Sequence, residues 1–291
     1  MKPDSPAAAR LPEPLLIADS GSTKTDWLLR ADGMWQRFQT GGMNPFLMSE
    51  EELGRTLADA LTADRLRTAP LRVYFWGAGC RDAGACRMNS ALRTFFPKAD
   101  VHVESDLAGA AHALFGSAPG IACILGTGSN SGVFDGRQIV ANIPPLGYLL
   151  GDEGSGASLG KRFLNALLKG ELTQEINGFF YERYATTAAR LLHDVYHAAA
   201  PNRYLAQFAP FLHATRHHAE IRQILLDEFT LFFRRNVCPY HRPDLPIGFV
   251  GSIAYHFSEE LREAARCVGI KAGDTLQQPL DAFLTMPDRL P

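Results

Sequence analysis

The hydrophobic positions of the chain fall into short runs separated by polar, glycine-rich turns. An apolar run at 15–19 (LLIAD) and a second at 26–30 (DWLLR) are joined by a short polar turn, which predicts an antiparallel hairpin. An Asp-Gly turn signal within 31–40 predicts a third strand. Helical spacing over 49–63 follows, with Ser49 as the expected N-cap.

The alternation continues along the chain. Residues 71–79 predict a strand that enters a glycine loop, and 101–116 predict a short strand followed by an alanine-rich helix. The order is thus β-β-β-α-β-α, and a new strand, glycine loop and strand begin at 120–140. Periodicity predicts mostly helix over 157–242, and then a strand, a Gly-Ser turn and an amphipathic helix over 245–269.

Two glycine- and hydroxyl-rich turns occupy equivalent places in this order. DSGSTKTD and LGTGSNSG are about 105 residues apart, which suggests a weak internal repeat of two similar domains. The pattern predicts an α/β protein with a loose tail at 1–14, an N-terminal domain at 15–117 and a C-terminal domain at 118–291. We expect a helical insertion in the second domain. Packing of the last helix on the first domain is left open.

Composition excludes several classes of partner. The 291 residues are 46% hydrophobic and 21% charged with a net charge of -2, which gives no electrostatic basis for a nucleic-acid or membrane partner. The tail lacks the apolar core of a signal peptide, so a cytoplasmic protein is expected. The five cysteines include one close pair, Cys80 and Cys86, interpreted as reduced structural thiols. Histidines within 213–218 (HATRHH) are interpreted as a solvated helix face.

The first turn is not a P-loop, because Thr23 rather than glycine precedes Lys24 and a strand follows. Backbone amides around Gly21, the hydroxyls of Ser22 and Thr23 and the charge of Lys24 nevertheless predict a phosphate site. Asp19, at the end of the strand, is a candidate to hold Mg²⁺ through water. An ordinary polar hairpin is the alternative.

The second turn offers the same chemistry. Gly126 and Gly128 permit a close approach of the backbone to a ligand, and Thr127, Ser129 and Asn130 supply polar contacts. A structural hairpin is the alternative for this turn taken alone. Two such hairpins in equivalent places could clamp one polyphosphate from two sides.

Two further positions lie where a strand gives way to a helix. Asp106 is a candidate general base for phosphoryl transfer, and a helix N-cap is the alternative. Gly251 and Ser252 suit an adenosine or phosphate group beside a helix N-terminus, and a tight turn is the alternative.

An acidic pair, Asp152 and Glu153, lies between glycines before a helical run. A carboxylate there could accept two hydrogen bonds from neighbouring sugar hydroxyls. Helix capping by Asp152 or Ser155 is the alternative.

Together these motifs resemble the N-acetylglucosamine kinase branch of the BadF/BadG/BcrA/BcrD ATPase family, within the actin, hexokinase and heat-shock-chaperone superfamily. Their order and spacing match over about residues 15 to 260. The motifs are DSGSTKTDWLL, ESDLAGAAHALFG, ILGTGSNSGVFDG, PLGYLLGDEGSGASLGKR and GFVGSIA. The sequence is similar to a bacterial, Bacteroidetes-type subgroup.

The resemblance implies two ribonuclease-H-like domains with an interdomain cleft that closes on its substrates. It also implies ATP, Mg²⁺ and transfer of the γ-phosphoryl group to the 6-hydroxyl of an amino sugar. Asp106 matches the catalytic base of the family, and Thr23 and Thr127 match positions that contact ATP.

The resemblance implies a sugar site as well. Asn44 matches the sugar-contacting asparagine, while Gly77 and Ala78 depart from the family and offer backbone contacts only. The remaining sugar-segment matches are Pro145, Leu146, Gly147 and Asp152. Leu146 replaces a usual aromatic residue, so N-acetylglucosamine, N-acetylmuramic acid and glucosamine all stay open as acceptors.

Two other functions are compatible with the fold. An ATPase activator of a reductase or dehydratase needs paired cysteines for an iron–sulfur cluster, and Cys123 has no matching pair in the sequence. A non-catalytic sugar sensor is disfavoured because Asp19, Asp106 and Asp152 are all retained. A homodimer is expected by analogy only.

Overall fold

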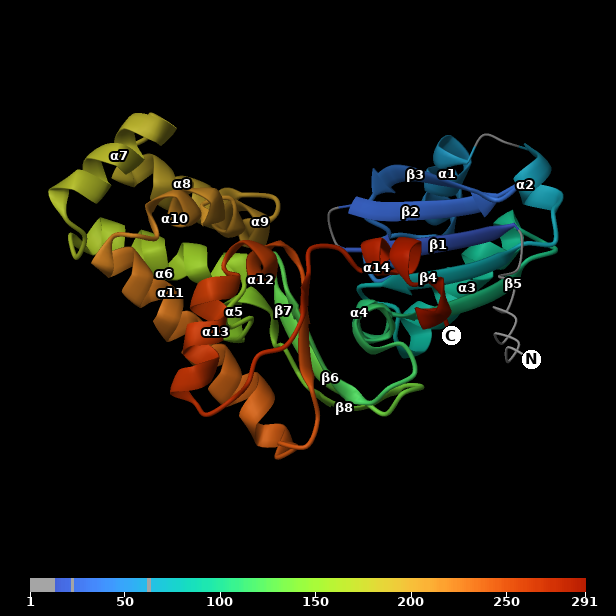
Figure 1. The fold of residues 1–291 in the computed structure, drawn as a ribbon. Helices are drawn as coiled ribbons and strands as arrows, with labels where there is room; N and C mark the ends of the chain where they lie inside the picture. Colours follow the sequence, from blue (N-terminus) through green and yellow to red (C-terminus); the bar gives the residue numbers. More distant parts are fainter. Residues whose placement is uncertain (1–13, 22–23, 62–63) are drawn as a thin grey trace. The chain divides into compact units, whose positions relative to one another are not determined.

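The computed structural model describes residues 14–21, 24–61 and 64–291, which form two units (Figure 1). The first unit comprises the described residues up to Gly109 together with Ala282–Leu290, and the second comprises Ala110–Asp281 and Pro291. The predicted N-terminal tail, apart from Pro14, lies outside the described residues.

The first unit is built on a mixed five-stranded sheet in the order β3-β2-β1-β4-β5. The strands are β1 (Leu15–Ser20), β2 (Lys24–Ala31), β3 (Met34–Gly41), β4 (Arg72–Gly77) and β5 (Asp100–Ser105). β1 pairs antiparallel with β2 and parallel with β4, so the predicted hairpin is confirmed. The central position of β1 follows from its composition, since its apolar side chains are buried on both faces.

Helices complete the first unit. They are α1 (Glu50–Ala60), α2 (Asp64–Thr68), α3 (Asp82–Phe95), the start of α4 (Asp106–Phe115) and the end of α14 (Pro279–Thr285), with a 3-10 turn η3 at Pro287–Arg289. Ser49 caps α1 in a capping box with Glu52, as the sequence predicts. Phe283 of α14 stacks on Trp76 of β4 with ring centroids 5.1 Å apart, so the end of the chain packs on the first sheet.

The second unit repeats the arrangement of the first. Its sheet has the order β8-β7-β6-β9-β10, equivalent strand for strand to that of the first unit. The strands are β6 (Gly120–Leu125), β7 (Ser129–Phe134), β8 (Ile139–Ile143), β9 (Ile247–Val250) and β10 (Thr275–Leu276). The internal repeat read from the two glycine turns is therefore confirmed, because β6–β7 is again an antiparallel hairpin beside a parallel strand.

A large helical layer packs on this second sheet (Figure 1). The helices are α5 (Gly147–Leu150), α6 (Gly156–Lys169), α7 (Gln174–Tyr184), α8 (Ala188–His197), α9 (Pro201–Ala206), α10 (Ala209–Thr215), α11 (Ala219–Phe232), α12 (Ser252–His256) and α13 (Ser258–Cys267), with a π-helix η1 (Phe233–Val237) and a 3-10 turn η2 (Cys238–Tyr240). Phe163, Phe180, Phe208 and Phe211 form its buried aromatic core. In the described part of the chain, no helix combines the length and apolarity needed to cross a bilayer.

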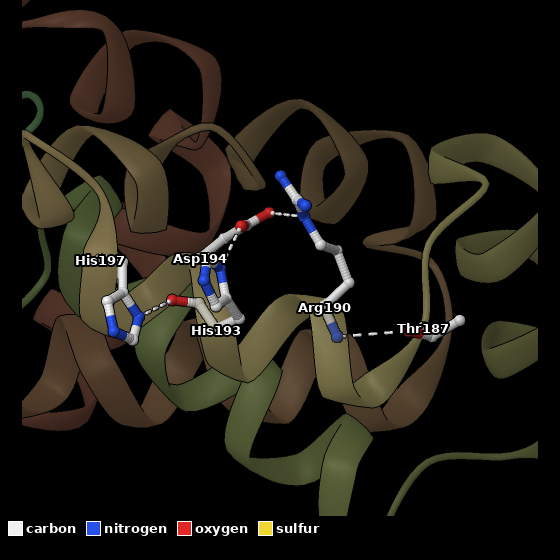
Figure 2. A network of polar contacts seen from close by, with 5 residues as sticks. All are labelled: Thr187, Arg190, His193, Asp194 and His197. Atoms are coloured by element: carbon white, nitrogen blue, oxygen red, sulfur yellow. Dashed lines mark hydrogen bonds and ion pairs between the residues drawn. The ribbon is translucent and has the colours of Figure 1, made fainter.

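The exposed side of α8 carries a local polar network (Figure 2). Thr187 caps the helix by accepting from the backbone N–H of Arg190, and the Arg190 guanidinium contacts Asp194 at 2.9 Å. His193 contacts the same carboxylate at 3.1 Å, and His197 lies 2.7 Å from the carbonyl oxygen of His193. Hydrogen bonds from His193 and Arg190 lower the pKa of Asp194. This network stabilises the helix face, and we assign it no catalytic role.

Candidate active site

The end of the β1–β2 hairpin is closed by hydroxyl groups. The hydroxyls of Ser20 and Thr25 are 2.7 Å apart, and Ser20 Oγ also accepts from the backbone N–H of Met43 at 3.1 Å. The backbone N–H of Gly21 donates to the carbonyl of Lys24 at 3.0 Å. Ser22 and Thr23, predicted to contact phosphate, lie outside the described residues. These bonds tie together the end of β1 and the start of β2 on either side of residues 22–23.

Asp19 and Asp26 face each other across this hairpin as directly paired residues. Two carboxylates in such a pair repel each other. Asp26 is buried and is held by Lys24 Nζ at 2.8 Å and Gln39 Nε2 at 2.5 Å. The sequence interpretation gives Asp26 no chemical role and gives Lys24 a phosphate role, whereas here the Lys24 ammonium contacts Asp26.

Asp19 has an unusual electrostatic environment. Burial, and then the negative charges of Asp106 and Asp26, raise the pKa of Asp19 to about 7. A cation beside this carboxylate would relieve the repulsion, so the residues fit Mg²⁺. Among the described residues, no group of three or more His, Cys, Asp or Glu side chains could hold a metal by itself. Asp19 would thus be a single protein ligand, as is usual for Mg²⁺ bound with water and phosphate oxygens.

Asp106 begins α4 at the end of β5. Ser105 provides the N-cap of α4, because its Oγ accepts from the backbone N–H of Ala108, the third residue of the helix, at 3.3 Å. Asp106 Oδ1 accepts from the backbone N–H of the adjacent Leu107, at 2.9 Å. Burial raises the pKa of Asp106, although the nearby Arg81 opposes the shift. A capping role alone therefore does not account for Asp106, and Arg81 is a neighbour that the sequence motifs did not indicate.

Asn44 and the loop after β4 lie together in the first unit. Gly79 has a φ of +81°, and a Cβ at this position would come within 2.5 Å of Asn44 Oδ1. The backbone N–H of Ala78 donates to the carbonyl of Ser20 at 2.8 Å, which ties the loop to the end of β1. A Cβ at Gly77 would meet the Phe75 ring at 2.7 Å. The predicted sugar contacts Asn44, Gly77 and Ala78 thus come from one packed cluster near the end of β1.

The β6–β7 hairpin of the second unit is anchored on the start of α6. The backbone N–H of Gly126 donates to the carbonyl of Gly128 at 2.9 Å and closes the turn. Gly156 N–H donates to the Gly126 carbonyl at 2.8 Å, and Ala157 N–H donates to the Thr127 carbonyl at 3.1 Å. The first helical N–H groups therefore fix the shape of the predicted phosphate turn.

Asp152 lies against this hairpin. Its Oδ1 accepts from the backbone N–H of Ser129 at 3.2 Å, and its backbone has a left-handed φ of +56°. Burial, and then the charge of Glu153, raise the pKa of Asp152. The cap of α6 is Ser155, which accepts from the Ser158 N–H at 3.1 Å. Asp152 is therefore not the helix cap, and its second carboxylate oxygen has capacity for a ligand.

Glu153 points to a different set of partners. Its carboxylate receives Arg235 Nη1 at 2.8 Å and Asn236 Nδ2 at 3.1 Å, both from the π-helix. Burial alone would raise the pKa of Glu153, but these hydrogen bonds lower it below its ordinary value. The sequence predicts that Asp152 and Glu153 both belong to the sugar site. In the structure, the Glu153 carboxylate instead holds its loop to the π-helix.

The segment before the acidic pair is folded into a tight loop. Leu146 and Gly147 both have left-handed φ angles, +60° and +72°. The backbone N–H of Asp152 donates to the carbonyl of Pro145 at 2.9 Å, which closes the loop. The Leu146 side chain remains 62% exposed, so it is open to a ligand at the position where the resemblance expects an aromatic ring.

A pocket of about 400 Å³ adjoins the second hairpin. Gly126, Thr127 and Ser252, predicted from the sequence for a nucleotide site, are among its lining residues. The rest of the lining has no predicted nucleotide role and comprises Gly156, Ala206, Gln207, Ala209, Pro210, His213, Ile253, His256 and Phe257. Apolar walls with a few polar groups are typical of a site for a flat organic ring.

The expectation for His213 was wrong. His213 is partly buried and lines the pocket instead of forming a solvated face. Its Nε2 lies 2.8 Å from Arg216 Nη1, and because a guanidinium only donates, this nitrogen must accept. Burial, and then the charge of Arg216, lower the pKa of His213. Amphipathic spacing could not reveal this position, because the opposite wall comes from α12.

Gly251 connects β9 to α12 beside this pocket. Its φ is +119°, and a Cβ there would lie 2.3 Å from the carbonyl oxygen of Leu125. The backbone N–H of Gly251 donates to the Leu276 carbonyl at 3.0 Å. Only glycine allows the two strands and the helix start to meet so closely.

Replacing Gly251 with alanine is expected to destabilise the protein and weaken nucleotide binding. The left-handed backbone and the clash together should cost about 2 kcal/mol, or roughly 5 °C in Tm. Thermal unfolding and nucleotide titration measure the two effects. Gly54→Ala in α1 is the control, because a Cβ there meets no atom within 4 Å and the helix gains. An equal Tm for both variants would contradict the prediction.

Comparisons with solved structures give whole-chain matches. A protein from Porphyromonas gingivalis, provisionally described as an N-acetylglucosamine kinase, is 42% identical, with a TM-score of 0.89 over 95% of this chain and 99% of that chain. A protein from Chromobacterium violaceum with the same provisional description is 19% identical, with a TM-score of 0.62 over 93% and 97%. Searches of protein-family models and of curated proteins found no match.

A third structure extends the likeness of fold. A ROK family glucokinase from Streptomyces griseus, in complex with glucose and AMPPNP, is 14% identical, with a TM-score of 0.57 over 95% of this chain and 97% of that chain. At this identity the match concerns the fold alone. The predicted α/β class, with ribonuclease-H-like units of the actin-like ATPase type, is confirmed.

Proposed function

Because the chain belongs to the N-acetylglucosamine kinase-like branch of the BadF/BadG/BcrA/BcrD ATPase family, we propose that it is an ATP-dependent kinase of an amino sugar. The proposal rests mainly on the environment of the Asp106 carboxylate. This carboxylate is partly buried, its pKa is raised, and the capping bond of α4 is supplied by Ser105. A general base for a sugar hydroxyl needs this combination.

The nucleotide is assigned to the pocket of the second unit. The base would lie between the apolar walls, with Ser252 at the start of α12 and the anchored turn at Gly126–Gly128 toward the phosphates. Gly21, Ser22, Thr23 and Lys24 are proposed as phosphate contacts of the first hairpin. The proposal for Lys24 requires its ammonium to leave or share Asp26 when a nucleotide binds.

The chemistry is an in-line phosphoryl transfer. Asp106 takes the proton of the 6-hydroxyl as its oxygen bonds to the γ-phosphorus, and the bond from that phosphorus to the β,γ-bridging oxygen breaks to release ADP. Mg²⁺ held at Asp19 would neutralise phosphate charge when bound. Because the charge of Asp106 raises the pKa of Asp19, a cation held at Asp19 would also relieve this repulsion and favour the carboxylate form of Asp106.

The sugar is assigned to Asn44, the backbone of Gly77 and Ala78, Asn130, the 145–147 loop and Asp152. Asp152 is suited to accept from two sugar hydroxyls, because the hydrogen bond from the Ser129 N–H to Oδ1 fixes the orientation of its carboxylate. The role of Glu153 is proposed to be indirect, through the loop that it ties to Arg235. Salvage of amino sugars is the metabolic setting that such an activity would serve.

A panel of acceptors tests the proposal. Purified protein with Mg²⁺ and ATP is offered N-acetylglucosamine, N-acetylmannosamine, N-acetylmuramic acid, glucosamine and glucose, and the phosphorylated position is assigned by NMR. We expect ATP consumption with at least one amino sugar and a product phosphorylated at the 6-position. If none of the amino sugars is phosphorylated, the proposed function fails. Phosphorylation of glucose alone would retain a sugar kinase and exclude the amino-sugar assignment.

A further inference from the structure

The side-chain amide of Asn130 is oriented by its neighbours on β7 and β8. Its Oδ1 accepts from the backbone N–H of Ser131 at 2.9 Å and from Asn142 Nδ2 at 2.8 Å. An amide oxygen has two lone pairs, so both are now used. For the Asn130 NH₂ group, no hydrogen-bond partner is found among the residues that the structure describes. Asn130 is therefore a donor toward any ligand.

The backbone determines which way each amide points. The Ser131 N–H can only donate, so the Asn130 atom that faces it must be the oxygen. Asn142 Nδ2 also lies 2.6 Å from the Ser131 carbonyl and 3.3 Å from the Ile143 carbonyl, which can only accept. A rotated Asn142 would place its oxygen against these carbonyls. The two amides thus form a chain with one possible polarity.

We propose that Asn142 is a positioning residue that holds Asn130 with its NH₂ group available to the acceptor sugar. The inference rests on the proposed function, in which Asn130 contacts the sugar. Its chemical consequence is that the group of the sugar at this point must offer an oxygen with a free lone pair, such as a carbonyl or a hydroxyl. An ammonium group offers only donors and is disfavoured there.

Loss of Asn142 removes one of the two bonds that hold the Asn130 oxygen. The remaining bond, from Ser131 N–H, comes from the adjacent residue and permits the side chain to rotate more freely. The sugar would then have to order the side chain on binding, which weakens affinity without changing the chemical step. The expected signature is a raised KM for the sugar with little change in kcat.

Tyr240 supplies a matched control for the pairing of the strands. Its hydroxyl donates to the Ser131 carbonyl and accepts from the Ile143 N–H, both at 2.9 Å. Its hydroxyl also lies 2.9 Å from Ser131 Oγ. Tyr240→Phe therefore disturbs the same pair of strands at Ser131 and Ile143, while the Asn142–Asn130 bond is kept. An effect that is merely structural should appear in both variants.

Steady-state kinetics of Asn142→Leu and Tyr240→Phe test the proposal. Asn142→Leu should raise the sugar KM about tenfold, with kcat and the ATP KM within about twofold, and Tyr240→Phe should leave all three within about twofold. In an Asn130→Ala background, Asn142→Leu should add little further loss. Equal sugar KM values for the two single variants, or full additivity with Asn130→Ala, would overturn the inference.

Crystal structures of the wild type and of Asn142→Leu test it without relying on activity. We expect one Asn130 rotamer in the wild type and more than one in the variant. A single unchanged rotamer in Asn142→Leu would overturn the role of Asn142 whatever sugar is used. A wild-type protein that phosphorylates no sugar would overturn the proposed function and leave this structural test standing.

Discussion

Replacing Asp106 with asparagine is expected to lower kcat for sugar phosphorylation by about a thousandfold, the middle of the range for loss of a general base. Asparagine keeps the size of the side chain and its acceptor for the Leu107 N–H, but it cannot take the proton of the 6-hydroxyl. Nucleotide affinity should stay within about twofold. Single-turnover phosphorylation and nucleotide titration of the same preparation measure both quantities.

The same substitution should raise the thermal stability of the protein. Burial raises the pKa of Asp106, so at pH 8 the folded state holds a carboxylate that it disfavours, and a neutral amide removes that cost. Ser105→Ala is the matched control, because it removes the cap of α4 and should lower Tm while most activity remains. Full activity in Asp106→Asn would remove Asp106 from its assigned role.

Much of the arrangement at the first hairpin could be predicted from the sequence. The apolar runs and the short turn define β1 and β2, and their pairing alone places Asp19 opposite Asp26. The raised pKa of Asp19 could not be predicted from the sequence pattern. It depends partly on the charge of Asp106, which follows a different strand, β5. The sequence motifs assign no role to Asp26, whereas in the structure its charge raises the pKa of Asp19.

Two other omissions have separate physical causes. Helix α3 was missed because its first turn contains Gly84, which in a linear pattern is typical of a loop. A Cβ at Gly84 would lie 2.1 Å from the Gly79 carbonyl, so glycine is needed there for the helix to approach that loop. Glu153 was paired with Asp152 by adjacency, but its partners Arg235 and Asn236 follow some 80 residues later.

The pH dependence of Mg²⁺ activation is expected to depend on Asp19. Its pKa of about 7 in the metal-free protein means that protons compete with the cation below neutral pH. Between pH 8 and pH 7 the Mg²⁺ concentration for half-maximal activity should change little, and between pH 7 and pH 6 it should rise several-fold. Mg²⁺ titrations of the kinase reaction at saturating ATP measure this, after correction for the protonation of ATP itself.

Asp19→Asn should abolish this dependence and lower kcat/KM at least a hundredfold, because an amide is a poor ligand for Mg²⁺. Asp26→Asn is the graded control, since it removes one of the charges that raise the pKa of Asp19 and should move the onset of proton competition below pH 7. The two variants thus distinguish loss of the metal-binding carboxylate from a change in its pKa. A Mg²⁺ dependence that is unchanged in Asp19→Asn would exclude Asp19 as the metal ligand.

The metal-free protein gives a second measure of the same carboxylate. A carboxyl group with a raised folded-state pKa contributes stability that is present at low pH and is lost as the pH rises through that pKa. The difference in Tm between Asp19→Asn and the wild type should therefore grow from pH 6 to pH 8 in favour of the variant, and saturating Mg²⁺ with nucleotide should reverse it. A difference in Tm that is independent of pH would mean that Asp19 keeps an ordinary pKa, and with it the electrostatic basis for a cation site would be lost.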